Sequence, residues 1–367
     1  MSRWAWAEVS AAAIEHNVRE IGRVVAPSQV WAVVKADGYG HGAVVAARAA
    51  MAGGAGGLCV ALVQEGVALR DAGVDAPILV LSEQPPSQTR AAIAAGLQLT
   101  VYNHAGLQAI VDAGGVGHPV HLKVDTGMRR VGAEAVVAAG MAAEIVASPA
   151  TVLVGVFTHL AVADEPHHEF TEHQLDRFES VLEAIRAAGV DPGLVHAANS
   201  AGALAHPRAR YDLVRAGIAI YGISPGSDVD PLCSGLSPAL ALKARVSHVK
   251  RVAAGERISY GLRHTFARDT TVATLPLGYA DGVPRRLHSV GGAVLIGGIA
   301  RPIAGVVTMD QTMVDCGDDE VRPGDEAVLL GTQGTRTITP ADWAARLDTI
   351  AYEIVCGISA RVERRTV

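Results

Sequence analysis

The chain has little of what marks several common protein classes. Only four of its 367 residues are cysteines and none form a C-x-x-C pair, so no disulfide framework or metal site is expected. Arg48 and the glycines at 53–57 interrupt the most apolar stretch, which argues against a membrane span. The first ten residues, MSRWAWAEVS, lack the apolar core of a signal peptide. Together these absences predict a cytoplasmic protein with reduced thiols.

Basic residues are not in excess either. There are 31 Lys and Arg against 37 Asp and Glu, and the net charge is −6. No dense basic stripe occurs, so a nucleic-acid partner is not expected. Half of the residues are hydrophobic and 19% are charged, which is typical of a globular protein, and the length favours two domains.

Eight short apolar runs alternate with Ala-rich helical stretches between about residues 11 and 222. Nearly continuous apolar runs are typical of parallel strands buried on both faces. Eight β/α units predict a TIM-type α/β barrel over residues 1–235, although a doubly wound sheet could give the same alternation. The runs are VWAVVKA (30–36), LCVALV (58–63), PILVL (77–81), LQLTVY (97–102), PVHLKVD (119–125), LVGVFTHL (153–160), LVHAAN (194–199) and IAIYG (218–222).

The pattern changes after about residue 235. Strand-like runs separated by turn signals such as RPGDE (322–326) replace the alternation, and helical periodicity returns only at PADWAARL (340–347). Residues 236–367 are therefore predicted to form a mainly β domain.

Polar side chains lie where the predicted barrel strands end. Active sites of α/β barrels are built at the C-terminal ends of the strands, so these residues are candidates for a site. Strands must end in polar loops in any case, so this pattern alone does not identify one. The residues are Lys35 after the first run, Lys123, Asp125 and Arg130 after the fifth, His159 after the sixth, Asn199 and Ser200 after the seventh, and Arg215 before the eighth.

Lys35 is the most informative of these residues. It follows the apolar run WAVV, and burial there would lower its pKa and favour a neutral amine able to form a Schiff base. On the strand alone, a lysine that reaches the surface is the favoured interpretation. The glycines of the following DGYGHG allow a backbone to pass close to a ligand. Tyr39 lies one helical turn on, where its hydroxyl could meet a phosphate.

The segment VVKADGYGHG (33–42) closely resembles the pyridoxal-phosphate (PLP) lysine motif of the alanine racemase family. Nine motifs in the family's order, covering both predicted domains, make the resemblance specific. It implies an eight-stranded α/β barrel followed by a β domain. The other eight motifs are HLKVDTGMRRVG (121–132), FTHLAVAD (157–164), AANSAG (197–202), VRAGIAIYG (214–222), ISYG (258–261), GYADGVPR (278–285), TMDQ (308–311) and AYEIVCGISARV (351–362).

The resemblance implies a two-base racemisation. Removing the Cα proton from one face and returning one to the other needs two acid/base groups, with PLP as the electron sink. These groups would be Lys35 and Tyr260, the latter supplied by a partner subunit, which implies a homodimer with shared sites. Arg215 would face the pyridine nitrogen and, because a guanidinium only donates, would keep that nitrogen unprotonated. His159 would lie near the cofactor and, with Arg215, tune Tyr260.

The resemblance also implies how the cofactor phosphate is held. Its ligands would be Tyr39, the hydroxyl and amide of Ser200, the amides of Gly217 and Ile218, and Tyr352. Ser200 and Gly217 lie near the last two predicted barrel strands, where this fold often binds a phosphate. Ser200 could equally be a simple helix N-cap.

The substrate carboxylate is expected to meet Arg130, together with the backbone amide of Met309 from the other subunit. Lys123 matches a lysine that can carry a carbamate in the family and would then brace Arg130. Asp310 would support the loop of Met309, and Tyr279 would line the entrance to the site.

Other interpretations remain. A racemase acting on serine or on several amino acids shares these motifs. A non-catalytic PLP-binding barrel would lack the β domain and its tyrosine, and a decarboxylase would need other cysteine and acidic motifs. The histidines of HHEFTEH (167–173) invite a metal site, but an exposed helix start explains them and racemisation needs no metal. The expected role is supply of D-alanine for peptidoglycan.

Overall fold

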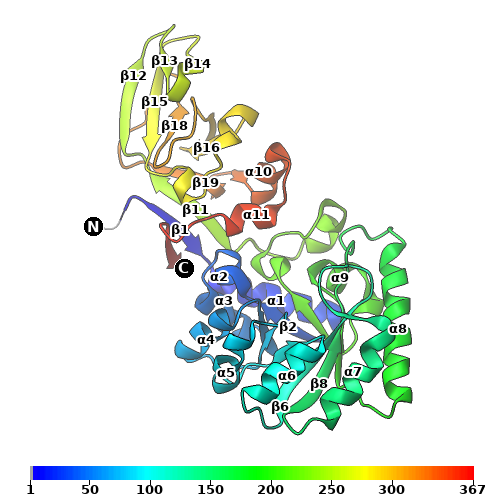
Figure 1. Ribbon diagram of the computed structural model, residues 1–367. Coiled ribbons are helices and arrows are strands. Elements are labelled where there is room, and N and C mark those ends of the chain that lie inside the picture. The colour runs from blue at the N-terminus through cyan, green and yellow to red at the C-terminus, as the bar shows by residue number, and fades with distance from the viewer. Residues whose placement is uncertain (1–2) are drawn as a thin grey trace. The chain divides into compact units, whose positions relative to one another are not determined.

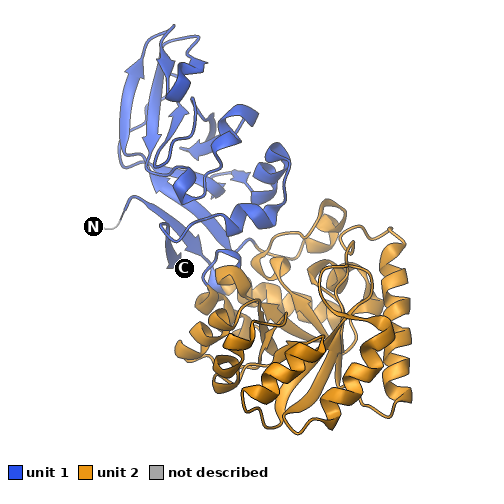
Figure 2. Cartoon of the chain, in the orientation of Figure 1, with its two compact units in different colours: residues 1–11, 39–42, 238–367 blue, residues 12–38, 43–237 orange. Residues whose placement is uncertain are grey.

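The structure is a computed structural model that describes residues 3–367. The chain forms two compact units, each described here by itself (Figure 2). The α/β unit comprises Ala12–Gly38 and Ala43–Ser237, and the β unit comprises Met1–Ala11, Tyr39–Gly42 and Pro238–Val367. Among the described helices, none has the length and apolar character needed to cross a membrane.

Eight parallel strands form the centre of the α/β unit (Figure 1). They run in the order β10-β2-β3-β4 and β5-β6-β8-β9. Backbone hydrogen bonds also join the two groups of strands at both of their edges. The N–H of Val80 donates to the carbonyl of Gln98 (2.9 Å) between β4 and β5, and the N–H of Arg215 donates to the carbonyl of Ala198 (2.9 Å) between β9 and β10. This is the strand order of an eight-stranded barrel. The strands are β2 (Gln29–Val33), β3 (Gly57–Val60), β4 (Ile78–Val80), β5 (Leu99–Val101), β6 (His118–Asp125), β8 (Thr151–Phe157), β9 (Leu194–His196) and β10 (Leu213–Ala216).

Helices follow most of these strands, and the longest of them, α8, buries one apolar stripe. In α8, Leu175, Phe178, Leu182 and Ile185 recur at intervals of three or four residues and are fully or almost fully buried. The side chain of Asn199 caps α9. The helices are α1 (Ala11–Val25), α2 (Lys35–Tyr39), α3 (Ala43–Ala52), α4 (Val63–Asp71), α5 (Pro86–Ala94), α6 (His104–Asp112), α7 (Ala135–Ala147), α8 (Phe170–Ala187) and α9 (Ser200–Ala205).

The predicted eighth strand is wrong in position. Residues 218–222 were expected to form it, but Ile218–Tyr221 is a 3₁₀ helix, η2, and the strand is β10, one segment earlier. β10 pairs in parallel with β2, with Leu213 opposite Gln29 and Ala216 opposite Ala32. Arg215 therefore lies within the last strand rather than before it. Both segments are apolar and buried, so hydrophobicity could not distinguish them.

The β unit contains one large sheet, a three-stranded sheet and a hairpin. The large sheet runs β17-β16-β19-β11-β1-β21, with β20 paired to β19. Helices α10 (Pro340–Leu347) and α11 (Ala351–Cys356) accompany it. An α/β domain followed by a mainly β domain confirms the predicted class. The strands are β1 (Ala5–Val9), β11 (Leu240–Arg245), β12 (His248–Val252), β13 (Arg257–Ile258), β14 (His264–Thr265), β15 (Thr270–Leu275), β16 (Ala293–Ile296), β17 (Ile299–Pro302), β18 (Thr312–Asp315), β19 (Glu326–Gln333), β20 (Arg336–Ile338) and β21 (Glu363–Thr366).

The N-terminal strand belongs to the β unit, which the sequence pattern did not indicate. β1 pairs antiparallel with β11 and parallel with β21, so both ends of the chain lie in one sheet. Arg3 extends this connection by a two-point ion pair with the buried Asp281, at 2.6 and 2.7 Å. Asp281 also accepts the backbone N–H of Gly278 at 2.9 Å.

The Arg3–Asp281 pair should stabilise the β unit in a pH-dependent way. Burial opposes ionisation of Asp281, but the Arg3 and Gly278 hydrogen bonds outweigh it and lower the pKa. The stabilisation is therefore fully present above the ordinary value of 3.8 and is lost as the pH falls through the lower folded pKa. Asp281→Asn should cost about 2 kcal/mol in urea unfolding at neutral pH, because Arg3 keeps some water contact.

The difference in unfolding free energy between the wild type and Asp281→Asn should become smaller as the pH falls below 3.8. Asp318→Asn, which removes an exposed ion pair with Arg251, is the matched control and should change the unfolding midpoint little. Equal effects of the two substitutions at neutral pH would contradict a special role for Asp281.

Candidate active site

Lys35 begins an unusual turn directly after β2. The turn is helical, as expected, but it is left-handed: Ala36, Asp37, Gly38 and Tyr39 have φ values of 52°, 51°, 62° and 53°. A left-handed conformation costs a non-glycine residue about 1 kcal/mol, so three of these four positions are strained. Such strain persists only where the surroundings impose it, and it is concentrated at functional sites.

Two carboxylates hold this turn in place. Glu65 of α4 accepts the N–H of Ala36 at 2.7 Å with one oxygen, and those of Ala61 and Leu62 at 2.8 and 3.0 Å with the other. Asp37, inside the turn, accepts the N–H of Ala43 at 2.8 Å and so satisfies the start of α3. The backbone after Lys35 is thereby tied to the first turns of two helices.

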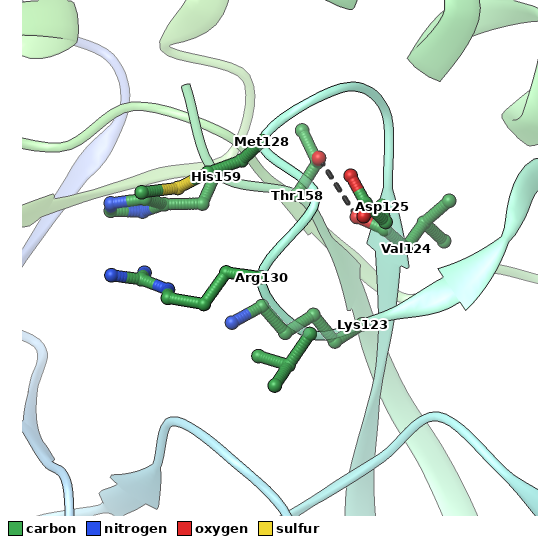
Figure 3. A pocket seen from close by; sticks show the side chains of 8 residues that line it. Lys123, Val124, Asp125, Met128, Arg130, Thr158 and His159 are labelled. Carbon is green, nitrogen blue, oxygen red and sulfur yellow. Dashed lines mark hydrogen bonds between the residues drawn. The ribbon is translucent and has the colours of Figure 1, made fainter. Parts of the chain in front are cut away.

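Lys123, Arg130 and His159 line one narrow cleft of the α/β unit (Figure 3). In that view the side chains of Arg130 and His159 extend in the same direction, and the Lys123 amine lies below Arg130. Burial, together with the charges of Arg215, Arg130 and Lys35, lowers the pKa of Lys123 to about 7. Only the Asp125 carboxylate opposes this shift, and it also accepts the backbone N–H of Gly127.

Arg215 lies inside the same unit and is only 3% exposed. Its Nη2 donates to the carbonyls of Thr158 (2.8 Å) and Ala197 (2.9 Å) and lies 3.3 Å from Nδ1 of His159. Its Nη1 donates to Nδ1 of His196 at 2.7 Å. Burial lowers the pKa of Arg215 to about 10, so it remains charged at neutral pH. Burial and the Arg215 charge also lower the pKa of His159 well below its usual value, which keeps that ring neutral.

Ser200 and the start of η2 form a small polar cradle. The Ser200 hydroxyl accepts the N–H groups of Gly217 at 2.9 Å and Ala219 at 3.3 Å. The structure thus brings Ser200, Gly217 and Ile218 together from two chain segments, as expected for phosphate ligands. In this structure the N–H of Gly217 donates to the hydroxyl of Ser200.

The α/β unit therefore fits an anionic cofactor. Lys123 and Arg130 line one cleft with His159, and after burial the charges of Arg215, Arg130, Lys123 and Lys35 all lower the pKa of His159. A gathering of basic side chains of this kind suits a phosphate and a substrate carboxylate. No group of three potential metal ligands occurs in residues 3–367.

The β unit holds the other candidate residues. The rings of Tyr39 and Tyr352 lie 6.0 Å apart, centroid to centroid, so two predicted phosphate ligands are neighbours. Tyr260, Met309 and Tyr279 are large apolar side chains with exposures of 73%, 52% and 42%. Asp310 is held by an ion pair with Arg361 at 2.6 Å.

The loops carrying the three exposed side chains are joined to one another. The hydroxyl of Ser259, next to Tyr260, donates to the carbonyl of Val306 at 2.7 Å. A few residues on, the carbonyls of Thr308 and Met309 accept the N–H groups of Tyr279 and Ala280 at 2.9 and 3.0 Å. The segment 306–309 thus links the loops of Tyr260 and Tyr279.

Sequence reasoning missed several residues that support these groups. Glu65 gave no recognisable signal, because its partners are backbone amides. His121 and His196 did carry one: a histidine inside an apolar strand must find hydrogen-bond partners when buried. Gln174 is fully buried and donates to the carbonyl of His159 at 3.0 Å, and Phe157 lies under Arg215, with its ring centroid 5.1 Å from the guanidinium carbon.

The fold and the cationic site define a class of two-unit proteins in which an α/β unit presents a strand-end lysine and a β unit follows it. Residues 9–225 match the family described as "Alanine racemase, N-terminal domain", and residues 239–366 match "Alanine racemase, C-terminal domain". The chain belongs to the alanine racemase family.

Similar proteins extend over the whole chain. An alanine racemase of Symbiobacterium thermophilum is 49% identical, covering 99% of this chain and 97% of its own length. One from Thermobifida fusca is 45% identical, covering 99% and 98%. Among solved structures, alanine racemase from E. faecalis superposes with a TM-score of 0.93 at 37% identity, covering 100% and 98%. The Bacillus anthracis enzyme with bound L-Ala-P gives 0.95 at 37% identity, covering 100% and 96%.

Glu65→Gln should loosen the turn that carries Lys35. The substitution keeps the size but replaces one acceptor oxygen by a donor, so at least one of three N–H groups loses its partner. The expected cost is about 1–2 kcal/mol in unfolding, with faster hydrogen exchange at the Ala36 amide. Glu183→Gln, at an exposed position of α8, is the control. Unchanged exchange at Ala36 would show that Glu65 does not hold the turn.

Proposed function

We propose that this protein interconverts L-alanine and D-alanine by a two-base mechanism with PLP held on Lys35. The observation that carries the proposal is the gathering of basic side chains at one cleft: Lys123 and Arg130 line it with His159, and Nη2 of Arg215 lies 3.3 Å from Nδ1 of His159. Such a cleft suits a cofactor phosphate and an amino-acid carboxylate. We further propose that the enzyme acts in the cytoplasm and supplies D-alanine for peptidoglycan, as is typical of the family.

Each cation has a distinct proposed task. When bound, PLP supplies an electron sink that makes the substrate Cα–H acidic. The Lys35 amine anchors the cofactor and moves a proton on one face of the substrate. Arg130 binds the substrate carboxylate. Arg215 only donates hydrogen bonds and stays charged, so it keeps the pyridine nitrogen unprotonated and limits the electron sink.

The proposed phosphate ligands are Ser200, the amides of Gly217 and Ile218, Tyr39 and Tyr352. In the α/β unit the Ser200 hydroxyl already lies beside the Gly217 N–H at 2.9 Å. The neighbouring rings of Tyr39 and Tyr352 supply two hydroxyl groups from the β unit. These groups carry no net charge, so the positive charges of the site supply the electrostatic attraction.

Tyr260 is proposed as the second base, contributed by a partner subunit. Its 73% exposure would be unusual for a catalytic tyrosine unless another surface covered it. Met309 and Tyr279 are exposed on loops linked to its own, which supports a common docking surface. We therefore propose a homodimer in which residues 1–235 bind PLP and residues 236–367 complete the partner's site, with Asp310 steadying the Met309 loop and Tyr279 at the entrance.

Lys123 has a proposed supporting role. A pKa of about 7 leaves much of its amine neutral at physiological pH, and the neutral amine is the form that adds to carbon dioxide. The resulting carbamate would reverse the charge at this position from positive to negative. An anion there would brace Arg130, whose guanidinium lies in the same cleft.

Alanine is the proposed substrate, and serine or a broader range is the alternative. A racemisation assay with each enantiomer of alanine, serine and lysine tests the proposal directly. We expect turnover of both alanine enantiomers and much less of the others. No turnover of any amino acid would overturn the function, and preferred turnover of serine would overturn only the substrate.

Tyr260→Phe should uncouple proton exchange from racemisation. With one base left, the enzyme can still remove and return the Cα proton on a single face. In deuterated water, one alanine enantiomer should incorporate deuterium with retained configuration, while racemisation falls by about 100-fold or more. Tyr102→Phe, in the α/β unit, should leave the ratio of exchange to racemisation unchanged. Equal loss of exchange and racemisation for both enantiomers would remove Tyr260 as the second base.

Mixing two inactive variants should restore activity if sites are shared. Lys35→Ala and Tyr260→Phe each damage every site of their own homodimers. After subunit exchange, each hybrid dimer contains one site with an intact Lys35 and an intact Tyr260 from opposite subunits. Activity should therefore appear in the mixture but in neither protein alone. If Tyr260 served its own subunit's site, no hybrid would contain an intact site and the mixture would stay inactive.

A further inference from the structure

A chain of hydrogen bonds leads from Arg215 through two buried histidines to Gln98. Arg215 Nη1 lies 2.7 Å from Nδ1 of His196, Nε2 of His196 lies 3.0 Å from Nδ1 of His121, and Nε2 of His121 lies 2.8 Å from Oε1 of Gln98. His196 and His121 are completely buried. The residues of this hydrogen-bond chain lie on three strands of the α/β unit, β10, β9 and β6, and the last residue, Gln98, directly precedes β5.

The chemistry of arginine fixes the direction of every bond in this chain. A guanidinium has five donors and no acceptor, so Nδ1 of His196 must accept. A neutral His196 then carries its proton on Nε2 and donates to Nδ1 of His121. His121 in turn carries its proton on Nε2 and donates to the amide oxygen of Gln98. Burial and the Arg215 charge depress the pKa of both rings, so neither histidine becomes a second cation.

Both ends and the middle of the chain are held in place. Gln98 is anchored by backbone hydrogen bonds, donating to Ile78 at 2.8 Å and accepting from Val80 at 2.9 Å. The Phe157 ring stacks on His196 with centroids 4.7 Å apart and planes within 4°. Neither ring can rotate without losing these contacts, so the chain presents one fixed acceptor to Arg215.

This acceptor decides which donors of Arg215 remain for a ligand. One Nη1 hydrogen goes to His196, and the two Nη2 hydrogens go to the carbonyls of Thr158 and Ala197. Within residues 3–367, the Nε–H and the second Nη1–H of Arg215 donate no hydrogen bond. Without His196 the guanidinium could turn about its own axis and offer a different edge.

We propose that His196, His121 and Gln98 are positioning residues that orient Arg215, with the Gln98 amide oxygen setting the tautomer of both histidines from the far end. This inference rests on the proposed function, because the donors left free are those available to the cofactor's pyridine nitrogen. The same chain could in principle serve only to satisfy buried polar groups. A purely structural role would affect folding stability but would not couple Gln98 to Arg215.

The tautomers themselves are measurable without any turnover. Nitrogen-15 NMR of the imidazole rings in the full-length protein should show His196 and His121 neutral, protonated on Nε2 and unprotonated on Nδ1, at neutral pH. Their signals are assigned by their absence in the corresponding variants. A proton on Nδ1 of either ring would overturn the proposal, since the chain would then run in the opposite direction.

Changes at Gln98 test the far end, where the side chain is only partly buried and folding is least at risk. Gln98→Leu removes the acceptor, and we expect mixed tautomers at His121 and about tenfold weaker PLP binding in a spectral titration. Gln98→Glu keeps an acceptor oxygen and should retain both tautomers and affinity. Equal PLP affinity in wild type and Gln98→Leu, or equal losses in the Leu and Glu variants, would overturn the proposal.

His196→Leu tests the near end against a matched buried histidine. His206 is also buried, and its Nε2 lies 3.1 Å from the carbonyl oxygen of Ala163, outside the chain. Both Leu variants should lose thermal stability, but only His196→Leu should lose PLP affinity by about tenfold or more. Equal affinity in the two variants overturns the positioning role. Racemisation by the wild type is measured in parallel, so failure of the proposed function shows there and not in these comparisons.

Discussion

The positive charge of Arg215 inside the α/β unit is the constraint on which the site depends. A buried guanidinium without a carboxylate is costly, and here neutral acceptors offset the cost: two carbonyl oxygens and the Nδ1 atom of His196. A carboxylate partner would neutralise the charge, whereas neutral acceptors preserve it. Burial, and after it the preserved charge, lowers the pKa values of Lys123, His159, His121 and His196, so one residue contributes to the protonation state of all four.

The turn after Lys35 shows a second constraint, of backbone rather than charge. Three non-glycine residues lie in the left-handed region, and Glu65 holds the turn by accepting the N–H of Ala36 while its other oxygen accepts two N–H groups at the start of α4. The result is a lysine whose backbone is fixed by helices on either side. For a residue proposed both to anchor a cofactor and to move a proton, such fixation limits misplacement of the amine.

Three of the candidate residues in the β unit are exposed rather than buried. Tyr260, Met309 and Tyr279 are exposed on linked loops, while β1 and β21 pair in one sheet of the same unit and Arg3 forms an ion pair with Asp281. A rigid sheet carrying exposed apolar loops is suited to completing a site on another surface. The proposed dimer thus follows from what the β unit leaves uncovered.

The sequence by itself determined the α/β class, the mainly β second domain and the candidate residues, because apolar periodicity and local motifs are properties of neighbouring residues. Tertiary structure alone decided that the eighth strand is Leu213–Ala216 and not 218–222, since both segments are equally apolar and only pairing with β2 separates them. It also decided that β1 joins the distant β21. Glu65 and the relay from Arg215 to Gln98 emerge only in three dimensions, because their bonds link residues that lie far apart in sequence. Lys35 could be recognised from its motif. The left-handed turn that holds it depends on the Glu65 carboxylate, which lies 29 residues after Ala36 in the sequence. Parallel pairing of β2 and β3 brings the two segments close together.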